Sequence, residues 1–150
     1  MVEQLNPGAL PHQFKALEAY VPDLPQEFYD LYLINNGKES NYDVPSILLG
    51  LIMLNLDEIA KDYKVWKDIL KNYPEYGQEE GLSFPSGHIK TDYINLGRIS
   101  ILGDTGGNFV GIDLDPGPLG QKGQIINFGR DQEDKYVIAS SLGEFLEFAL

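Results

Sequence analysis

The residues whose types and spacing most suggest chemistry lie at positions 101–117, in the stretch ILGDTGGNFVGIDLDPG. A glycine-rich turn at residues 103–107 separates two apolar runs, and two aspartates follow, Asp113 and Asp115. Glycines at the end of a strand can cradle a phosphate, and paired carboxylates can hold a divalent cation. The third interpretation is a hairpin turn with acidic neighbours.

A phosphate cradle does not fit the spacing of these glycines. A dinucleotide-binding turn needs Gly-x-Gly-x-x-Gly between a strand and a helix, because the phosphate meets the N-terminus of that helix. Here the glycines are Gly103, Gly106 and Gly107, and the residues that follow, NFVGIDLD, have the pattern of a strand. The Gly-Lys-Ser/Thr end of a P-loop is also missing from this stretch. The sequence therefore predicts neither kind of phosphate site.

A calcium loop of the EF-hand type fails at two positions. Counted from Asp113, such a loop needs glycine at the sixth position and an acid at the twelfth, where this chain has Pro118 and Gln124. An Asp-x-Asp pair at the end of a strand can still hold Mg²⁺ beside a phosphate substrate. A small Mg²⁺-dependent enzyme or phosphate binder that uses Asp113 and Asp115 is therefore kept as an alternative. Two aspartates on one face of a strand equally suit a solvated edge that resists aggregation.

No other residues form a recognisable catalytic or metal-binding set. The chain has no cysteine, which excludes disulfides and thiolate zinc sites. Its two histidines, His12 and His88, lack a third nitrogen or sulfur ligand, and a Gly-x-Ser-x-Gly nucleophile turn is absent. We expect no catalytic residue, no metal and no cofactor.

The composition is that of one globular domain over residues 1–150, with 43% hydrophobic and 23% charged residues. No apolar run is long enough to cross a membrane, and no secretory signal is recognisable, so we expect a cytoplasmic protein. The net charge of −12 argues against nucleic acid as a direct partner and favours basic protein surfaces. High solubility is the simpler explanation of the same charge.

The elements that must position these residues are four helices and a run of strands. The spacing of apolar residues predicts helices at residues 11–20, after Pro25, at 55–70 and from Ser141 onward. In the second helix Phe28, Leu31, Tyr32 and either Leu33 or Ile34 form the expected buried stripe, and Gly37 marks its end. Capping boxes are expected from Asn55 with Glu58 and from Ser141 with Glu144.

Strands alternate with turn residues in the second half of the chain. One strand is expected at residues 44–54, a polar loop at 72–92, and further strands at 96–104, 108–115, 123–129 and 134–139. Helices, then hairpin-linked strands, then a terminal helix predict an α+β fold. We expect a mainly antiparallel sheet of about five to six strands, flanked by N-terminal helices, a middle helix and a C-terminal helix.

Several short motifs recur in a fixed order that resembles the SUKH superfamily. This superfamily includes the yeast Smi/Knr-type cell-wall assembly regulators and many bacterial immunity proteins. The motifs, in chain order, are Ala16-Leu17-Glu18, Leu24-Pro25-x-x-Phe28, Asn36-Gly37, Leu54 to Ile59 with Trp66 two helical turns later, Ile101 to Phe109, Ile112 to Pro116, Gly123 to Ile125, and Phe145-Leu146. The chain departs from the pattern at Thr105, where glycine is usual, and at Asn108, where an acid is usual. The Tyr93-Ile94-Asn95 region replaces a tryptophan that is often found before the central strand.

The resemblance implies protein binding rather than catalysis. Its bacterial members imply an immunity protein that neutralises a toxin, often a nuclease, and an acidic chain suits the basic surface of such a partner. A regulatory scaffold of the yeast kind is the alternative. The expected contact surface combines acids of the hairpin region with exposed aromatic residues: Asp104, Asp113, Asp115, Asp131, Glu133, Asp134, Tyr42 and Tyr93. The expected turn glycines are Gly37, Gly103, Gly106 and Gly107.

Overall fold

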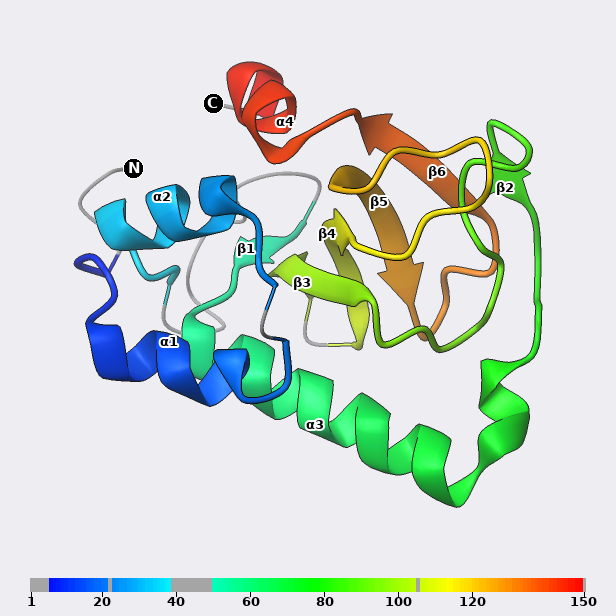
Figure 1. Cartoon of the computed structure of the whole chain (residues 1–150), viewed down its shortest axis with the longest axis horizontal. Coiled ribbons are helices and arrows are strands. Elements are labelled where there is room, and N and C mark those ends of the chain that lie inside the picture. Colours follow the sequence, from blue (N-terminus) through cyan, green and yellow to red (C-terminus); the bar gives the residue numbers. More distant parts are fainter. Residues whose placement is uncertain (1–5, 22, 39–49, 105, 150) are drawn as a thin grey trace.

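The structure is a computed structural model that describes residues 6–21, 23–38, 50–104 and 106–149. Four α-helices, one 3₁₀ helix and six strands follow one another along these residues (Figure 1). The helices are α1 (Pro11–Glu18), α2 (Gln26–Ile34), α3 (Leu56–Asn72), the 3₁₀ helix η2 (Pro74–Gly77) and α4 (Leu142–Ala149). The strands are β1 (Ile52–Met53), β2 (Ser83–Phe84), β3 (Arg98–Gly103), β4 (Asn108–Asp113), β5 (Gln124–Gly129) and β6 (Lys135–Ala139).

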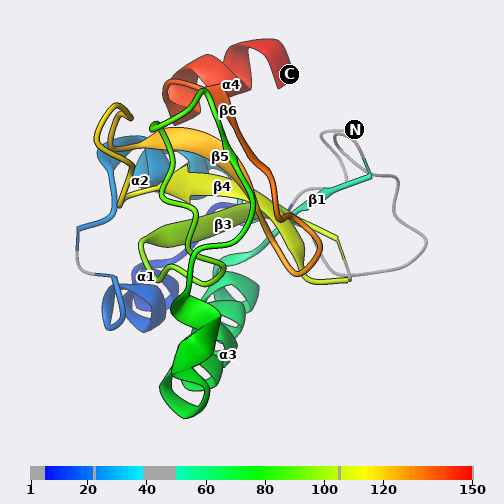
Figure 2. The same cartoon turned by 90° about the vertical axis from the view of Figure 1, so that its right-hand side faces the viewer.

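The six strands form one sheet in the order β1-β3-β4-β5-β6-β2. Every neighbouring pair is antiparallel except β2 with β6, which is parallel. In the view of Figure 2, α1 and α3 lie on the β3 side of the sheet and α4 lies beyond β6. Two helices contact the strands of the sheet: α3 contacts β3, and α4 contacts β5 and β6. The predicted α+β fold with a mainly antiparallel sheet is confirmed.

The central strands are buried along almost their whole length. All six residues of β3 and five of the six in β4 are buried. A strand that is covered on both faces is mostly apolar rather than strictly alternating, and the segments RISILG and NFVGID are apolar, with glycine counted, at four of six positions each. These strands were predictable for that reason, and their flanking turns set their limits.

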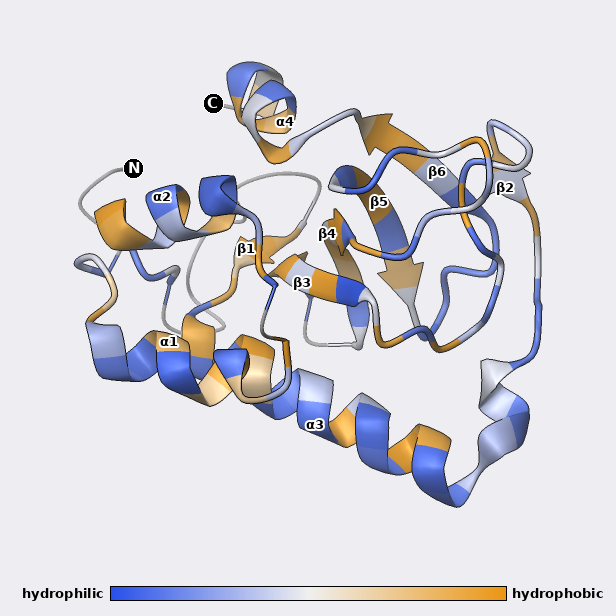
Figure 3. Ribbon diagram, viewed as in Figure 1, coloured by the Kyte–Doolittle hydropathy of each residue, from blue (hydrophilic) through white to orange (hydrophobic). Residues whose placement is uncertain are grey.

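The third helix begins as its capping box predicts. The backbone N–H of Glu58 donates to Oδ1 of Asn55 at 2.8 Å, and the N–H of Asn55 donates to Oε2 of Glu58 at 3.1 Å. Figure 3 shows apolar patches along the otherwise hydrophilic α3. Among them, Leu56 and Ile59 are buried against the core, so the first turns of α3 fix where the whole helix lies.

The buried stripe of α2 differs from the prediction at one position. Phe28 and Tyr32 are fully buried and Leu31 packs against the core, but Leu33 and Ile34 are 58% and 77% exposed. At about 100° per residue, Leu33 lies about 140° and Ile34 about 120° around the helix from Phe28. The expectation that one of them completes the stripe is therefore wrong.

The structure also differs from the predictions in two segments, the strand at residues 44–54 and the loop at residues 72–92. Of the strand expected at residues 44–54, the structure describes positions 50–54, where β1 (Ile52–Met53) pairs with β3 and the N–H of Leu54 donates to the carbonyl of Ile101. The predicted loop at 72–92 contains η2 and the short strand β2, whose Ser83 and Phe84 pair with Lys135 and Tyr136. No helix in the described part of the chain is long and apolar enough to cross a membrane.

Candidate functional site

The glycine-rich turn between β3 and β4 is organised by the carboxylate of Asp104. Its Oδ1 accepts hydrogen bonds from the backbone N–H groups of Gly106 at 2.7 Å and Asn108 at 3.0 Å, and its Oδ2 accepts one from the Asn108 amide at 3.1 Å. Burial disfavours the charged carboxylate, but these hydrogen bonds stabilise it more strongly, so the pKa of Asp104 lies below its usual value. The N–H groups that a phosphate would need are thus occupied by the turn's own side chain.

The four turn glycines have different roles in the backbone. Gly37 and Gly107 have φ angles of 70° and 87°, which are left-handed conformations that favour glycine. Gly37 is two residues beyond the C-cap of α2 at Asn35, and an added Cβ there would lie 2.5 Å from the Leu54 backbone. Gly103 and Gly106 have no positive φ, and a Cβ at Gly103 would meet the ring of Phe109 at 3.0 Å.

The two aspartates after β4 are engaged by neighbouring residues. Asp113 is only 1% exposed, and it accepts hydrogen bonds from the N–H of Asp115 at 3.1 Å and from the Gln124 amide at 2.9 Å. Burial raises the pKa of Asp113, although these bonds oppose the shift. The predicted contact of Asp113 with a partner has little support in this geometry, because its carboxylate is buried and bonded within the chain.

Asp115 is more exposed but forms a local ion pair. Its Oδ1 lies 2.7 Å from Nζ of Lys90, and its Oδ2 accepts a hydrogen bond from the Asn95 amide at 3.0 Å. These two bonds are the main reason that the pKa of Asp115 is lowered. Within the described ranges, no three His, Cys, Asp or Glu side chains come together as a potential metal site.

The remaining predicted contact residues lie around the β5–β6 turn. Asp131, Glu133 and Asp134 are exposed, although Oδ1 of Asp134 also accepts a hydrogen bond from the N–H of Leu82 at 3.0 Å. Tyr93 is half-buried, and its hydroxyl donates to the carbonyl of Arg130 at 3.0 Å, which places it beside this acidic turn. Tyr42 lies outside the described residues.

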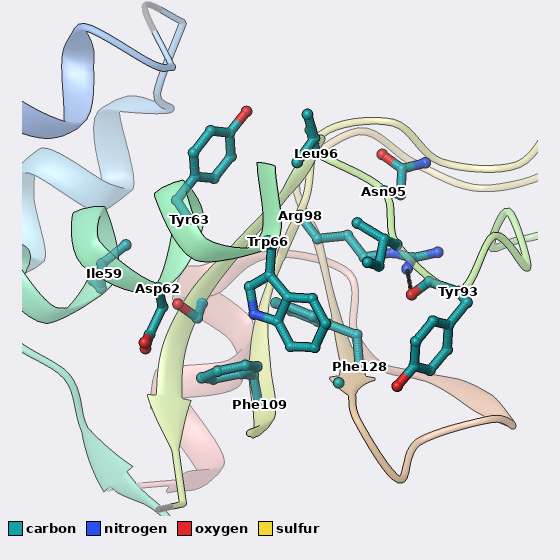
Figure 4. Close-up of a pocket in the computed structure, with 13 residues that line it drawn as sticks. Ile59, Asp62, Tyr63, Trp66, Tyr93, Asn95, Leu96, Arg98, Phe109 and Phe128 are labelled. Atoms are coloured by element: carbon teal, nitrogen blue, oxygen red, sulfur yellow. Dashed lines mark hydrogen bonds between the residues drawn. The ribbon is translucent and has the colours of Figure 1, made fainter. Parts of the chain in front are cut away.

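A groove lies between α3 and the sheet. We call it the aromatic groove, and the residues that define it are Asp62, Tyr63 and Trp66 of α3, Tyr93, Phe109 of β4 and Phe128 of β5. The rings of Trp66 and Phe109 meet edge to face with centroids 6.5 Å apart, and those of Phe109 and Phe128 are 5.6 Å apart. Figure 4 shows Asp62 and Trp66 projecting from α3 in the same direction, toward Phe109.

The sequence contains a partial signal for this groove. Ile59, Asp62, Tyr63 and Trp66 are spaced i, i+3, i+4 and i+7, so they share one face of α3. The apolar spacing of Ile59, Tyr63 and Trp66 belongs to the helix predicted at residues 55–70, but periodicity does not show where that helix leaves room above the sheet. An acidic residue within that apolar face, Asp62, was the signal that the sequence analysis missed.

Arg98 holds the opposite wall of the aromatic groove in place. Its side chain is 5% exposed, and its guanidinium donates to the carbonyls of Lys90 at 2.7 Å, Asp92 at 2.8 Å and Tyr93 at 3.3 Å. Burial lowers the pKa of Arg98, while nearby carboxylates, chiefly Asp113, oppose the shift. The buried cation thereby fixes the segment that carries Tyr93.

A ridge of exposed tyrosines continues from the groove. Tyr93 lies 5.9 Å from Tyr76, and Tyr76 lies 6.2 Å from Tyr73, measured between ring centroids. Tyr73 and Tyr76 are both exposed. Aromatic residues that surround a concave site provide large contact areas with little loss of side-chain entropy, as in many protein interfaces. The geometry therefore suits recognition of a protein segment.

The sequence matches a known protein family and several fungal proteins. Residues 8–147 match the SMI1 / KNR4 family (SUKH-1). The chain is 35% identical over 132 residues to the cell wall biosynthesis/cell cycle regulator smi1 of Schizosaccharomyces pombe, which covers 82% of this chain and 26% of that protein. It is 26% identical to the cell wall assembly regulator SMI1 of Saccharomyces cerevisiae, over 90% of this chain and 32% of that protein.

A third relative is the glucan synthesis regulatory protein of Neurospora crassa, 29% identical over 97% of this chain and 34% of that protein. The chain thus spans about a quarter to a third of the length of these relatives. All three are named as regulators rather than as enzymes.

Proposed function

Because this chain belongs to the SMI1 / KNR4 family (SUKH-1), we propose that it is a non-catalytic protein-binding domain that acts as a regulatory adaptor. The names of its fungal relatives support a regulatory role over toxin neutralisation. The aromatic groove is the proposed docking site for a protein partner.

The observation that carries this proposal is the partly open aromatic groove. Its walls combine Trp66 and Tyr93 with phenylalanines of the sheet, and a tyrosine ridge extends it along the surface. Tryptophan and tyrosine are the residues most enriched among binding hot spots. The acids first expected to form the contact surface support it less, since Asp104, Asp113 and Asp115 are all bonded to neighbouring residues.

The test is quantitative capture of partners by the wild-type chain and two variants in cells of its source organism. Trp66→Ala removes a groove wall, and we expect it to lower the recovery of specific partners by about tenfold or more. Tyr136→Ala removes an aromatic residue that is exposed on β6, and serves as the matched control. Equal recovery by both variants, with both folded as judged by thermal unfolding, would contradict docking in the groove.

Toxin neutralisation is the second candidate, and the net charge of −12 favours it because a nuclease presents a basic surface. Its distinguishing outcome is a captured basic nuclease domain whose activity is abolished by one equivalent of the chain. Capture of signalling or cell-wall proteins, without inhibition of a nuclease, favours the regulatory adaptor.

A further inference from the structure

The carboxylate of Asp62 is the one acidic group among the residues that define the aromatic groove. It lies on the same face of α3 as Trp66, and both project toward the sheet (Figure 4). Within the part of the chain that the structure describes, no hydrogen bond or ion pair holds this carboxylate. Asp104, Asp113 and Asp115 differ in this respect, because each accepts at least two hydrogen bonds.

The surroundings of Asp62 make a carboxylate costly there. Burial raises the pKa of Asp62, and Glu58 one turn earlier adds to the shift, while Lys61 opposes it. A partly desolvated carboxylate gains more from an incoming cation than a fully hydrated one, because the surrounding medium screens the attraction less. Among the groove's polar lining residues, Asp62 is thus the group that favours an incoming positive charge.

The aromatic rings of the groove favour the same kind of ligand. The faces of tryptophan and tyrosine attract a cation that lies within about 6 Å of the ring. A guanidinium can stack on such a face while it forms two hydrogen bonds with a carboxylate, which an ammonium cannot do. Trp66 supplies a ring on the same side of α3 as Asp62 (Figure 4), so the groove matches an arginine side chain better than a lysine side chain.

Negative charge near the Tyr93 wall of the groove also favours a cationic ligand. Glu80 and Asp131 act on Tyr93 as nearby negative charges, and Arg130 only partly offsets them. The buried Arg98 faces the groove but directs its donors to three backbone carbonyls. Negative charge therefore lies near the Tyr93 wall as well as at Asp62.

We propose that the aromatic groove binds an arginine side chain of a partner protein, with Asp62 accepting from the guanidinium and Trp66 stacking on it. This inference rests on the proposed function, and it specifies the chemistry of the partner. Residues that flank the arginine would lie along the ridge formed by Tyr76 and Tyr73.

The test uses the 150-residue chain and short capped peptides, and it observes Trp66. Because this is the single tryptophan of the chain, its fluorescence and its indole N–H resonance report directly on the groove. The probes are Ac-Leu-Arg-Phe-NH₂, the same peptide with lysine, the same peptide with neutral citrulline, and free L-arginine. We expect the arginine peptide to bind about tenfold more tightly than the citrulline peptide, with the lysine peptide between them.

The variant Asp62→Asn should reduce the preference for arginine over citrulline to about one. Asp68→Asn removes the same charge from an exposed position of α3 and should keep the preference, which makes it the matched control. Thermal unfolding of both variants identifies any loss of folding. Because no hydrogen bond in the described part of the chain depends on Asp62, we expect Asp62→Asn to unfold at or above the temperature of the wild type.

Three results would overturn the inference. Equal affinity for the arginine and citrulline peptides would show that the groove accepts apolar segments without selecting a cation, and would leave the proposed function intact. No response of Trp66 to any peptide would rule out arginine binding in the groove. Free L-arginine binding as tightly as the peptide would show that no protein segment is recognised. Failure of the proposed function itself is detected separately, by partner capture with Trp66→Ala.

Discussion

Replacement of Arg98 by methionine should release the segment that forms the Tyr93 wall of the aromatic groove. Methionine keeps most of the aliphatic volume but leaves the carbonyls of Lys90, Asp92 and Tyr93 without their donor. Two of these bonds are short, at 2.7 and 2.8 Å, and the third, at 3.3 Å, is weak.

The magnitude follows from those two short bonds. A hydrogen bond to a charged group contributes about 1.5–3 kcal/mol, and the desolvation of the guanidinium offsets part of this. We therefore expect Arg98→Met to lower the free energy of unfolding by about 3 kcal/mol. Arg98→Lys keeps the charge but cannot reach all three carbonyls, and it should lose about 1–2 kcal/mol. A typical domain has 5–15 kcal/mol in total, so both variants should fold.

Urea unfolding measures the loss, provided that the slope of free energy against urea concentration stays constant. Arg130→Met is the matched control, because Arg130 is exposed and its replacement should cost under about 0.5 kcal/mol. Amide hydrogen exchange should show protection lost at residues 90–95 in Arg98→Met alone. A loss below about 1 kcal/mol, or unchanged protection at residues 90–95, would refute the role assigned to Arg98.

Three further substitutions test other parts of the fold. Asp104→Ala removes the acceptor that organises the glycine-rich turn and should cost about 1–2 kcal/mol in urea unfolding. Because the folded pKa of Asp104 is lowered, this difference should be full above the ordinary aspartate value of 3.8 and should shrink as the pH falls below it. Lys135→Met removes a fully buried lysine whose pKa is lowered from 10.5 to about 8, chiefly by burial. Between about pH 8 and pH 10.5 the unfolded chain binds more protons at Lys135 than the folded chain does. The free energy of unfolding of the wild type should therefore rise relative to that of the variant as the pH increases, by up to about 3 kcal/mol. Urea unfolding at a series of pH values measures this difference. Gly37→Ala should lower the free energy of unfolding by at least about 2 kcal/mol, because its Cβ would collide with the Leu54 backbone. Gly50 has a similar positive φ but open space around it, so Gly50→Ala should lose about half as much. Thermal unfolding measures both losses.

The elements that the sequence predicts correctly are marked by local sequence patterns. Strands β3 to β6 are apolar runs with turn residues on both sides, and α3 has a complete capping box. Strand β2 lacks such a signal, because its two residues lie in a polar loop rich in glycine and proline. It forms because Ser83 and Phe84 pair with β6, and that contact depends on the finished sheet.

The predicted contact residues show what a count of charges misses. Asp104 and Asp113 each accept a hydrogen bond from the N–H two residues later, at Gly106 and Asp115. Aspartate often forms this short-range turn, so the spacing itself could have indicated a structural role. The aromatic groove had only a partial local signal, in the face of α3 that carries Asp62 and Trp66, since its other walls come from the Tyr93 segment and the sheet and meet α3 only in the folded chain.

The net charge and the aromatic groove would act on different steps of binding under the proposed function. A charge of −12 speeds the approach of any basic protein, and salt screens this attraction beyond about 8–10 Å. A half-buried carboxylate such as Asp62 is screened less, and it affects how long a bound cation stays. Overall charge cannot distinguish one basic protein from another, whereas a groove that accepts one cation among aromatic rings can reject segments that lack it. Under the proposed function, the composition of the chain therefore favours a basic partner, and the groove provides the means to choose among such partners.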